Sequence, residues 1–137
     1  MTICQGRTVI ITGSGGGLGR AYALAFAQQG ANVVVNDIRA EAAQAVANEI
    51  NNTGGNAIAN SSDITTTATA QIIVDEAIAA FGEVHVLINN AGVLRDGMFV
   101  NSDEDAWDMV MRVHLKGHFC LANILSKRWR DQSKAGK

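Results

Sequence analysis

The sequence predicts an α/β fold, a doubly wound parallel sheet of the Rossmann type. Short apolar runs rich in β-branched residues recur along the chain, as expected of strands buried on both faces. Segments with a helical spacing of apolar residues lie between these runs. Because strand and helix alternate, we expect parallel strands joined by right-handed crossover helices.

The expected strands and helices can be placed by residue. Strong apolar runs predict strands over residues 8–11, 32–36 and 84–88, and residues 56–59 form a weaker fourth. The helices between them should bury three apolar stripes, which consist of Leu18, Ala21, Tyr22 and Ala25, of Ala42, Ala43, Val46 and Ile50, and of Ala70, Ile73, Val74, Ala77 and Phe81. A left-handed glycine should end each helix, at Gly30, Gly54 and Gly82.

A last helix is expected to begin near Ser102, whose hydroxyl would cap it. Asp103, Glu104 and Asp105 follow, and their negative charges favour the N-terminal end of a helix. The apolar residues beyond them predict that this helix continues toward Trp129.

Composition indicates one globular domain over residues 1–137, with 47% hydrophobic and 18% charged residues. A formal net charge of -2 offers no basic surface for nucleic acid, so nucleic acid is not an expected partner. No apolar run approaches the roughly 18 residues needed to cross a bilayer, so membrane binding is not expected either. Cys4 and Cys120 fit neither a disulfide framework nor a zinc site. We therefore expect a cytoplasmic protein without a metal.

The strongest functional signal is the stretch ITGSGGGLGR, which has five glycines within residues 11–20. It lies between the first expected strand and helix, where a doubly wound sheet binds a nucleotide pyrophosphate. Gly13 would let the chain turn off the strand, and Gly17 would let the backbone approach the phosphates. Gly19 would let the helix pack on the sheet. The alternative is a tight glycine turn that binds no ligand.

The glycine spacing points to a particular family. It differs from the dinucleotide fingerprint G-x-G-x-x-G, because Leu18 stands where the third glycine would fall. It reads Thr12-Gly13-x-x-x-Gly17-x-Gly19, which resembles the cofactor loop T-G-x-x-x-G-x-G of the short-chain dehydrogenase/reductase family. The resemblance implies that Thr12, Gly13, Gly17, Leu18 and Gly19 contact a bound dinucleotide.

Asp37 ends the second expected strand and suggests which dinucleotide would bind. A carboxylate there can accept both hydroxyls of the adenine ribose and would repel a 2′-phosphate, which favours NAD over NADP. The glycine loop also has no basic residue at Ser14, Gly15 or Gly16. The alternative is that Asp37 is a turn residue or helix cap leading into Arg39.

Two further motifs fall in register with that family. The stretch SSDIT resembles its D-V-T segment, which implies that Asp63 contacts the adenine ring; otherwise Asp63 would cap the next helix. The stretch NNAG matches the family's N-N-A-G motif. There Asn89 and Asn90 are implied to brace the sheet, and Asn89, Ala91 and Gly92 are expected at the cofactor.

The stretches NNAGVLRDGMF and WDMVMRVHLKGHF look most like the 3-hydroxyacyl-CoA dehydrogenase part of peroxisomal multifunctional enzymes and related bacterial proteins. His114 stands where the family usually has an Asn of a proton relay, so it is the candidate catalytic residue. His118 follows one helical turn later without a third metal ligand, which favours packing or a hydrogen bond over a shared metal. His85 is interpreted as a satisfied core residue.

The family's catalytic acid, a Tyr with a Lys four residues later, has no counterpart, because the single tyrosine is Tyr22. The family's sheet also has further strands, so the sheet is expected to be incomplete in this chain. We therefore expect the NAD(H)-binding N-terminal part, a fragment, of an oxidoreductase acting on a secondary alcohol or ketone, with a 3-hydroxyacyl-CoA as one candidate. Whether the chain itself is an enzyme stays open.

Two other functional classes are left. A nucleotide-binding module or subunit without turnover would keep the same loop. A methyltransferase that uses S-adenosylmethionine would also need glycines after the first strand and an acid after the second, but NNAG would have no role in it. The expected partners are a small-molecule substrate of the full-length protein and a second copy of the chain, paired through the helix beginning near Ser102.

Overall fold

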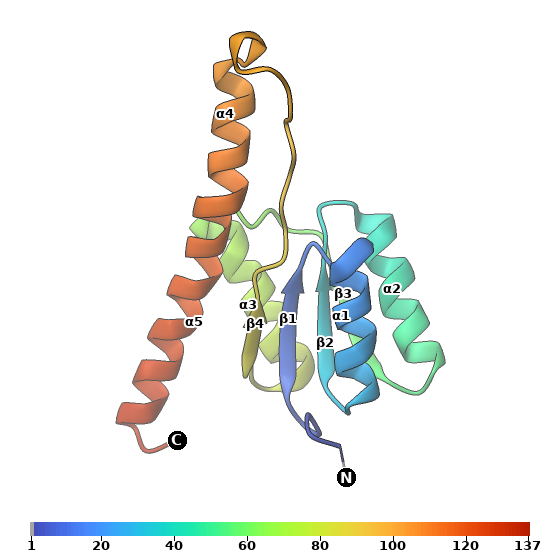
Figure 1. Ribbon diagram of the computed structural model, residues 1–137. Helices are drawn as coiled ribbons and strands as arrows, with labels where there is room; N and C mark the ends of the chain where they lie inside the picture. The colour runs from blue at the N-terminus through green and yellow to red at the C-terminus, as the bar shows by residue number, and fades with distance from the viewer. Residues whose placement is uncertain (1) are drawn as a thin grey trace.

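The computed structural model describes residues 2–137 and confirms the parallel α/β architecture. Four strands form one sheet in the order β3-β2-β1-β4, and every neighbouring pair is parallel (Figure 1). Their bounds are β1 (Thr8–Thr12), β2 (Asn32–Asn36), β3 (Asn56–Asn60) and β4 (Val86–Ile88). All carboxyl ends therefore meet at one edge of the sheet.

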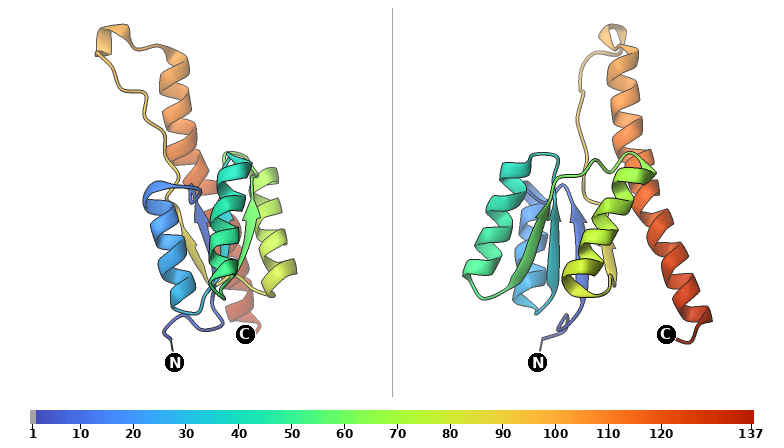
Figure 2. Two further views of the ribbon diagram at one scale, coloured as in Figure 1. Left: turned by 90° about the vertical axis from the view of Figure 1, so that its right-hand side faces the viewer. Right: turned by 180° about the vertical axis from the view of Figure 1, so that it is seen from behind.

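Helices cover both faces of the sheet (Figures 1 and 2). On one face α1 (Gly17–Gln28) and α2 (Ala40–Asn52) pack against Val9, Ile11, Val33 and Val35. On the other face α3 (Thr67–Phe81) and α5 (Gly117–Lys134) pack against Ile10 and Val34. Successive residues of β1 and β2 thus enter opposite halves of the core. None of the helices within residues 2–137 is long and apolar enough to cross a membrane.

The four predicted strands are present, with shifted ends. β1 and β3 each run one residue further than expected, and β4 begins at Val86 instead of residue 84. His85 therefore precedes the strand, and the prediction that it is a core residue is wrong, because its side chain is exposed. Its Nδ1 accepts the N–H of Thr8 at 2.9 Å, and its own N–H donates to Thr8 O at 2.9 Å. The histidine is satisfied at the rim of the sheet.

The predicted stripe of α1 is wrong. Leu18, Ala21, Tyr22 and Ala25 are all exposed, and Gly19 and Ala23 face the core instead. The physical reason is the close approach of α1 to the loop after β1: a Cβ on Gly19 would lie against the carbonyl oxygen of Gly13 and 2.7 Å from Ser14 Cα. The fully buried residues of α1 are therefore small, and Leu24 and Phe26 pack against the core in partly buried positions. By contrast, α2 and α3 turn their predicted stripes toward the sheet.

The first three helices end at the predicted glycines. Gly30, Gly54 and Gly82 have left-handed φ angles of 88°, 89° and 87°. Gly82 follows α3 directly and its N–H donates to Ile78 O at 2.8 Å. The glycines are needed there because other L-residues rarely adopt this conformation.

The last helix consists of three consecutive segments: α4 (Glu104–Met111), the π-helical turn η2 (Arg112–Lys116) and α5. The predicted cap at Ser102 is wrong, because Ser102 ends the short 3₁₀ turn η1 (Phe99–Asn101). Asp103 caps α4 instead, and its Oδ1 accepts the N–H of Ala106 at 2.7 Å. α4 extends beyond the carboxyl ends of the strands, away from both termini (Figures 1 and 2).

Glu83 fastens α5 to the turn before β4. Its carboxylate accepts hydrogen bonds from Arg128 Nε and Nη2 and from the N–H of Val84, each at 2.9 Å, and another from Gln132. Trp129 Nε1 adds a bond to Val84 O at 2.8 Å. The Arg128 hydrogen bonds, which outweigh the opposing effect of burial, lower the pKa of the Glu83 carboxyl to about 2.

We predict that Glu83→Gln lowers the free energy of unfolding at neutral pH. Because folding depresses the pKa of Glu83, its contribution is present above the ordinary value of 4.5 and is lost as the pH falls through about 2. Such a shift corresponds to at most about 3 kcal/mol. The two side chains are 36% and 28% exposed, so we expect about 1–2 kcal/mol.

Chemical denaturation across this pH range checks the prediction. The unmodified chain should lose stability more steeply in acid than Glu83→Gln. Glu41→Gln is the control, because Glu41 is exposed and forms no ion pair within the described residues, and it should behave like the unmodified chain. The same acid dependence in all three proteins would contradict the assignment.

Candidate functional site

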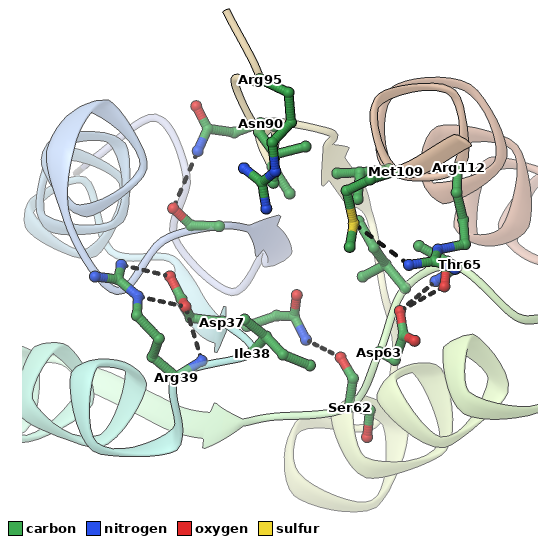
Figure 3. A pocket seen from close by; sticks show the side chains of 17 residues that line it. Asp37, Ile38, Arg39, Ser62, Asp63, Thr65, Asn90, Arg95, Met109 and Arg112 are labelled. Carbon is green, nitrogen blue, oxygen red and sulfur yellow. Dashed lines mark hydrogen bonds and ion pairs between the residues drawn. The ribbon is translucent and has the colours of Figure 1, made fainter. Parts of the chain in front are cut away.

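A cleft of about 580 Å³ opens where the carboxyl ends of the strands meet. Each strand is followed by a loop that contributes to its wall, through Gly13 after β1, Asp37 after β2, Asp63 after β3 and the residues that follow β4. The opposite wall comes from α4 and η2, which contribute Met109 and Arg112 (Figure 3). A crevice at this edge of an open α/β sheet is the usual ligand site of such folds.

The glycine loop fits an anionic group at the start of α1. Gly17 has a left-handed φ of 55°, and a Cβ built on it would meet no atom within 4 Å. The first turn of α1 contains no acidic residue. Open space at Gly17 and the positive end of the helix therefore coincide, as an anionic group requires. Leu18 is exposed on the outer side of the same turn.

Thr12 and Asn90 hold the glycine loop against the end of β4. Thr12 Oγ1 accepts the N–H groups of Asn90 and Ala91 at 3.1 and 3.0 Å. Asn90 Nδ2 donates to the carbonyl oxygens of Thr12 and Gly13 at 3.1 and 3.2 Å. Thr12 is fully buried, so it shapes the cleft without lining it.

Asn89 lies behind the cleft. Its Nδ2 makes a long contact of 3.5 Å with His118 O, and its buried Oδ1 has no hydrogen-bond partner within the described residues. Asn89 is not among the residues that line the cleft. It contacts the helix that covers the sheet, which supports the bracing role implied for this motif.

Asp37 points its carboxylate toward the glycine loop at one end of the cleft (Figure 3). Oδ2 accepts the N–H of Gly15 at 3.0 Å, and Oδ1 accepts the N–H of Arg39 at 3.0 Å. The Arg39 guanidinium adds two bonds of 3.1 Å. Burial alone would raise the pKa of Asp37, but the hydrogen bonds from Arg39 and Gly15 outweigh it and keep this pKa below its ordinary value. The carboxylate is therefore ionised at neutral pH.

Asp63 lines the cleft beyond the end of β3. Its Oδ1 accepts the N–H and the hydroxyl of Thr65 at 2.8 and 2.7 Å. The alternative role of Asp63 as a helix cap is excluded by the structure, because Thr66 caps α3 and its Oγ1 accepts the N–H of Thr69 at 3.2 Å.

His114 and His118 fix the backbone that follows β4. The N–H of Val93 lies 3.0 Å from His114 Nε2, which is also 2.9 Å from Val93 O. His118 Nε2 lies 3.3 Å from Ala91 O. A Cβ on Gly92 would lie 2.6 Å from His114 Cε1, so glycine is needed beneath the ring.

The two rings lie near each other but make separate contacts. Their centroids are 6.4 Å apart, and within residues 2–137 no cluster of three or more His, Cys, Asp or Glu side chains could hold a metal ion. Each histidine contacts a separate backbone group of residues 91–93, all of which line the cleft. Both side chains therefore support the cleft wall.

Half of the residues predicted at the cofactor line this cleft: Gly13, Asp37, Asp63, Ala91 and Gly92. The others lie at the end of β1, in the first turn of α1 or behind the wall: Thr12, Gly17, Leu18, Gly19 and Asn89. Sequence reasoning missed further lining residues, namely Asn36, Ile38, Ser62, Ile64, Thr65, Val93, Arg95, Met109, Arg112 and Val113. Arg39 and Asn90, which the sequence analysis named in other roles, also line the cleft. Ile38 could have been predicted at the cleft, because it directly follows Asp37 in the sequence.

Two proteins with similar sequences are named as enzymes. A hydroxyacyl-CoA dehydrogenase, ChsB1 of Mycobacterium tuberculosis, is 40% identical over 97% of this chain and 43% of its own length. The peroxisomal multifunctional enzyme type 2 of Mus musculus is 45% identical over 94% of this chain and 18% of its own length. The chain thus spans less than half the length of either relative.

Solved structures of two similar proteins have the same fold as this chain. A short chain dehydrogenase from Mycobacterium avium superposes with a TM-score of 0.95 at 46% identity, covering 100% of this chain and 52% of that one. A short chain dehydrogenase/reductase from Burkholderia phymatum, solved in complex with NAD, gives a TM-score of 0.88 at 31% identity, covering 93% of this chain and 45% of that one.

Nothing in these comparisons supports the methyltransferase alternative, since the similar proteins are named as dehydrogenases or as multifunctional enzymes. The family model described as short chain dehydrogenase matches residues 7–137. The cleft, its glycine loop and the match over nearly the whole chain lead to one conclusion: the chain belongs to the short-chain dehydrogenase family.

Proposed function

We propose that this chain is the NAD(H)-binding portion of an oxidoreductase that acts on a secondary alcohol or ketone. The observation that carries the proposal is the meeting of the glycine loop and the Asp37 carboxylate at one cleft, where Oδ2 lies 3.0 Å from Gly15 N. A dinucleotide needs an anion site and a ribose acceptor within its own length, and this cleft offers both.

Each group of the cleft would bind a different part of the dinucleotide. The backbone N–H groups around Gly17 would bind the pyrophosphate, and Asp37 would accept the adenine ribose hydroxyls. Asp63, across the cleft from Asp37, would lie at the adenine ring. When bound, NAD supplies the acceptor for a hydride from the substrate alcohol.

The names of the relatives support a substrate class. One similar protein is named a hydroxyacyl-CoA dehydrogenase, and the other is a peroxisomal multifunctional enzyme. We propose a 3-hydroxyacyl-CoA as the substrate of the full-length protein on this basis. A binding module without turnover would use the same cleft. Turnover of a 3-hydroxyacyl-CoA by the full-length protein would separate the two.

The contacts of His114 support a positioning role. Its Nε2 is engaged by the backbone of Val93, and its ring covers Gly92. A proton transfer role for His114 stays a prediction.

Pairing of two chains through the last helix also stays a prediction. That pairing is supported by an exposed apolar stripe on α4, η2 and α5, which consists of Trp107, Met111, Leu115 and Phe119.

We predict that Gly17→Ala weakens NADH binding at least tenfold, because the added methyl group would occupy the space that a phosphate needs. Gly54→Ala is the matched control. Both glycines have left-handed φ angles, 55° and 89°, and both have open space at the Cβ position, but Gly54 lies in the turn between α2 and β3. Each substitution should cost the fold about 1–2 kcal/mol of backbone strain.

Fluorescence titration with NADH distinguishes the two variants. Gly54→Ala should bind like the unmodified chain, since its strain lies at the opposite end of the sheet from the cleft. Equal weakening in both variants would mean that strain is the cause. Unchanged binding in Gly17→Ala would mean that the glycine loop is only a turn.

We also predict that the 137-residue chain binds NADH but does not oxidise 3-hydroxyacyl-CoA. The sequence has no Tyr-x-x-x-Lys pair, and loss of general acid-base catalysis costs roughly 10² to 10⁴ in rate. The measurement is the appearance of NADH absorbance when the purified chain is mixed with NAD and a 3-hydroxyacyl-CoA. Steady turnover that disappears in His114→Ala would contradict this expectation and identify His114 as the catalytic residue.

A further inference from the structure

A buried pair of asparagines joins the ends of β2 and β3 next to the cleft. Asn36 and Asn60 are the last residues of these strands and lie opposite each other in the register. Their exposed fractions are 2% and 5%. Asn36 Nδ2 donates to Asn60 Oδ1 at 2.9 Å and to the backbone oxygen of Ser62 at 3.1 Å. Asn36 lines the cleft, and Asn60 does not.

The hydrogen bonds of Asn60 fix the direction in which its amide points. Its Oδ1 also accepts the N–H of Ser62 at 2.9 Å, and a backbone N–H can only donate. Its Nδ2 donates to Glu76 Oε2 at 2.5 Å and to Ser62 Oγ at 3.3 Å. An ionised carboxylate can only accept. The carbonyl oxygen of the Asn60 side chain therefore faces Asn36.

This network also fixes the orientation of the Asn36 amide. The two groups that contact its Nδ2, Asn60 Oδ1 and Ser62 O, are both acceptors. The NH2 group must face them, because a carbonyl oxygen in its place would meet two acceptors without a proton between them. Asn36 Oδ1 therefore points away from this network, and it accepts no hydrogen bond from the described residues. A nearly fully buried side chain thus keeps one acceptor for a ligand in the cleft.

The position of Asn36 indicates which part of a dinucleotide would meet this acceptor. Asn36 directly precedes Asp37, which we place at the adenine ribose. Its amide contacts Ser62, which directly precedes Asp63, the residue that we place at the adenine ring. The free acceptor therefore lies where the base would bind. The strong hydrogen-bond donor that adenine offers is its 6-amino group.

Building on the proposed function, we propose that Asn36 is a specificity-determining residue, whose Oδ1 accepts a hydrogen bond from the 6-amino group of adenine. Asn60 and Ser62 hold this acceptor toward the cleft. Hypoxanthine has a carbonyl oxygen in place of the amino group, and this oxygen would meet Asn36 Oδ1 without a proton between them. A site with a buried acceptor rejects a ligand that leaves the acceptor unpaired. The cleft should therefore discriminate against a deaminated dinucleotide.

Fluorescence titration with NADH and with deamino-NADH, in which hypoxanthine replaces adenine, tests the inference. For the unmodified chain the dissociation constant of deamino-NADH should be at least fivefold that of NADH. In Asn36→Leu, which keeps the branched shape of the side chain but has no acceptor, the two constants should agree within twofold. The ratio of the constants is the useful readout, because a loss of folded protein weakens both dinucleotides alike.

Asn32→Leu is the matched control. Asn32 is the first residue of β2 and lies opposite Asn56 in the same register, at the other end of the strand from the cleft. Asn32→Leu should discriminate like the unmodified chain. If it also loses discrimination, disturbance of the strand is the cause and the role of Asn36 is overturned.

Asn36→Ser is a second variant for the case in which Asn36→Leu does not fold. Its hydroxyl can still donate to Asn60 Oδ1, but it has no carbonyl group to accept from the base. The two dissociation constants should again agree within twofold. Competition by AMP and by IMP, which differ only in the base, should give the same order of affinities as the two dinucleotides in each protein.

The outcomes separate this inference from the proposed function. If the unmodified chain binds NADH less than fivefold more tightly than deamino-NADH, the role of Asn36 is overturned and the NAD site stands. A fivefold ratio that persists in Asn36→Leu or Asn36→Ser assigns the discrimination to another residue and also overturns that role. An unmodified chain that binds neither dinucleotide overturns the proposed function and the inference together.

Discussion

Thr12 and Asn90 join the ends of β1 and β4 through four hydrogen bonds of 3.0–3.2 Å. The geometry of the cleft depends on this contact, because it brings the glycine loop against the wall that follows β4. The approach is so close that a Cβ on Gly13 would lie 2.8 Å from Ala91 Cα. A larger residue at Gly13 would separate the two loops that line the cleft.

The last helix also holds the backbone that follows β4 in place. His114 occupies the space above Gly92 and contacts the backbone of Val93, while His118 contacts Ala91 O. The π-helical turn η2, which includes His114, also contributes Arg112 and Val113 to the cleft. Such turns often occur at functional sites. The helix thus supports the wall with two histidines and forms the facing wall with residues just before them.

Patterns of neighbouring residues were sufficient to predict the strands and some of the residues at their carboxyl ends. Asp37 was predicted at the site because it ends a buried strand, and Asp63 because SSDIT resembles the family's D-V-T segment. Parallel strands place both residues at one edge of the sheet. The face of α1 was mispredicted, because contact with Gly13 and Ser14 requires Gly19 to face inward and leaves Leu18 exposed. The glycine spacing predicted the close packing of α1 at Gly19, but the apolar stripe proposed for α1 did not take this packing into account.

The far wall of the cleft could not be predicted for a related reason. Met109 and Arg112 reach it from α4 and η2, and the π turn changes the direction in which successive residues point. The cap at Asp103 differs from the expected one by a single residue, since η1 includes the backbone just before Ser102. The Asp37 carboxylate accepts hydrogen bonds from both Gly15 and Arg39. The sequence therefore predicted the acid but not its hydrogen-bond partners.

We propose that the loops at the carboxyl ends of the strands form a single dinucleotide site. Amide chemical shifts of the labelled chain, recorded by NMR during titration with NADH, test it most directly. A single site should give saturable shifts that share one dissociation constant at Gly15, Gly17, Asp37, Asp63 and Gly92, with little change in the turn at Gly54. Shifts confined to the outer faces of the helices, or no saturable shifts at the loop residues, would contradict it.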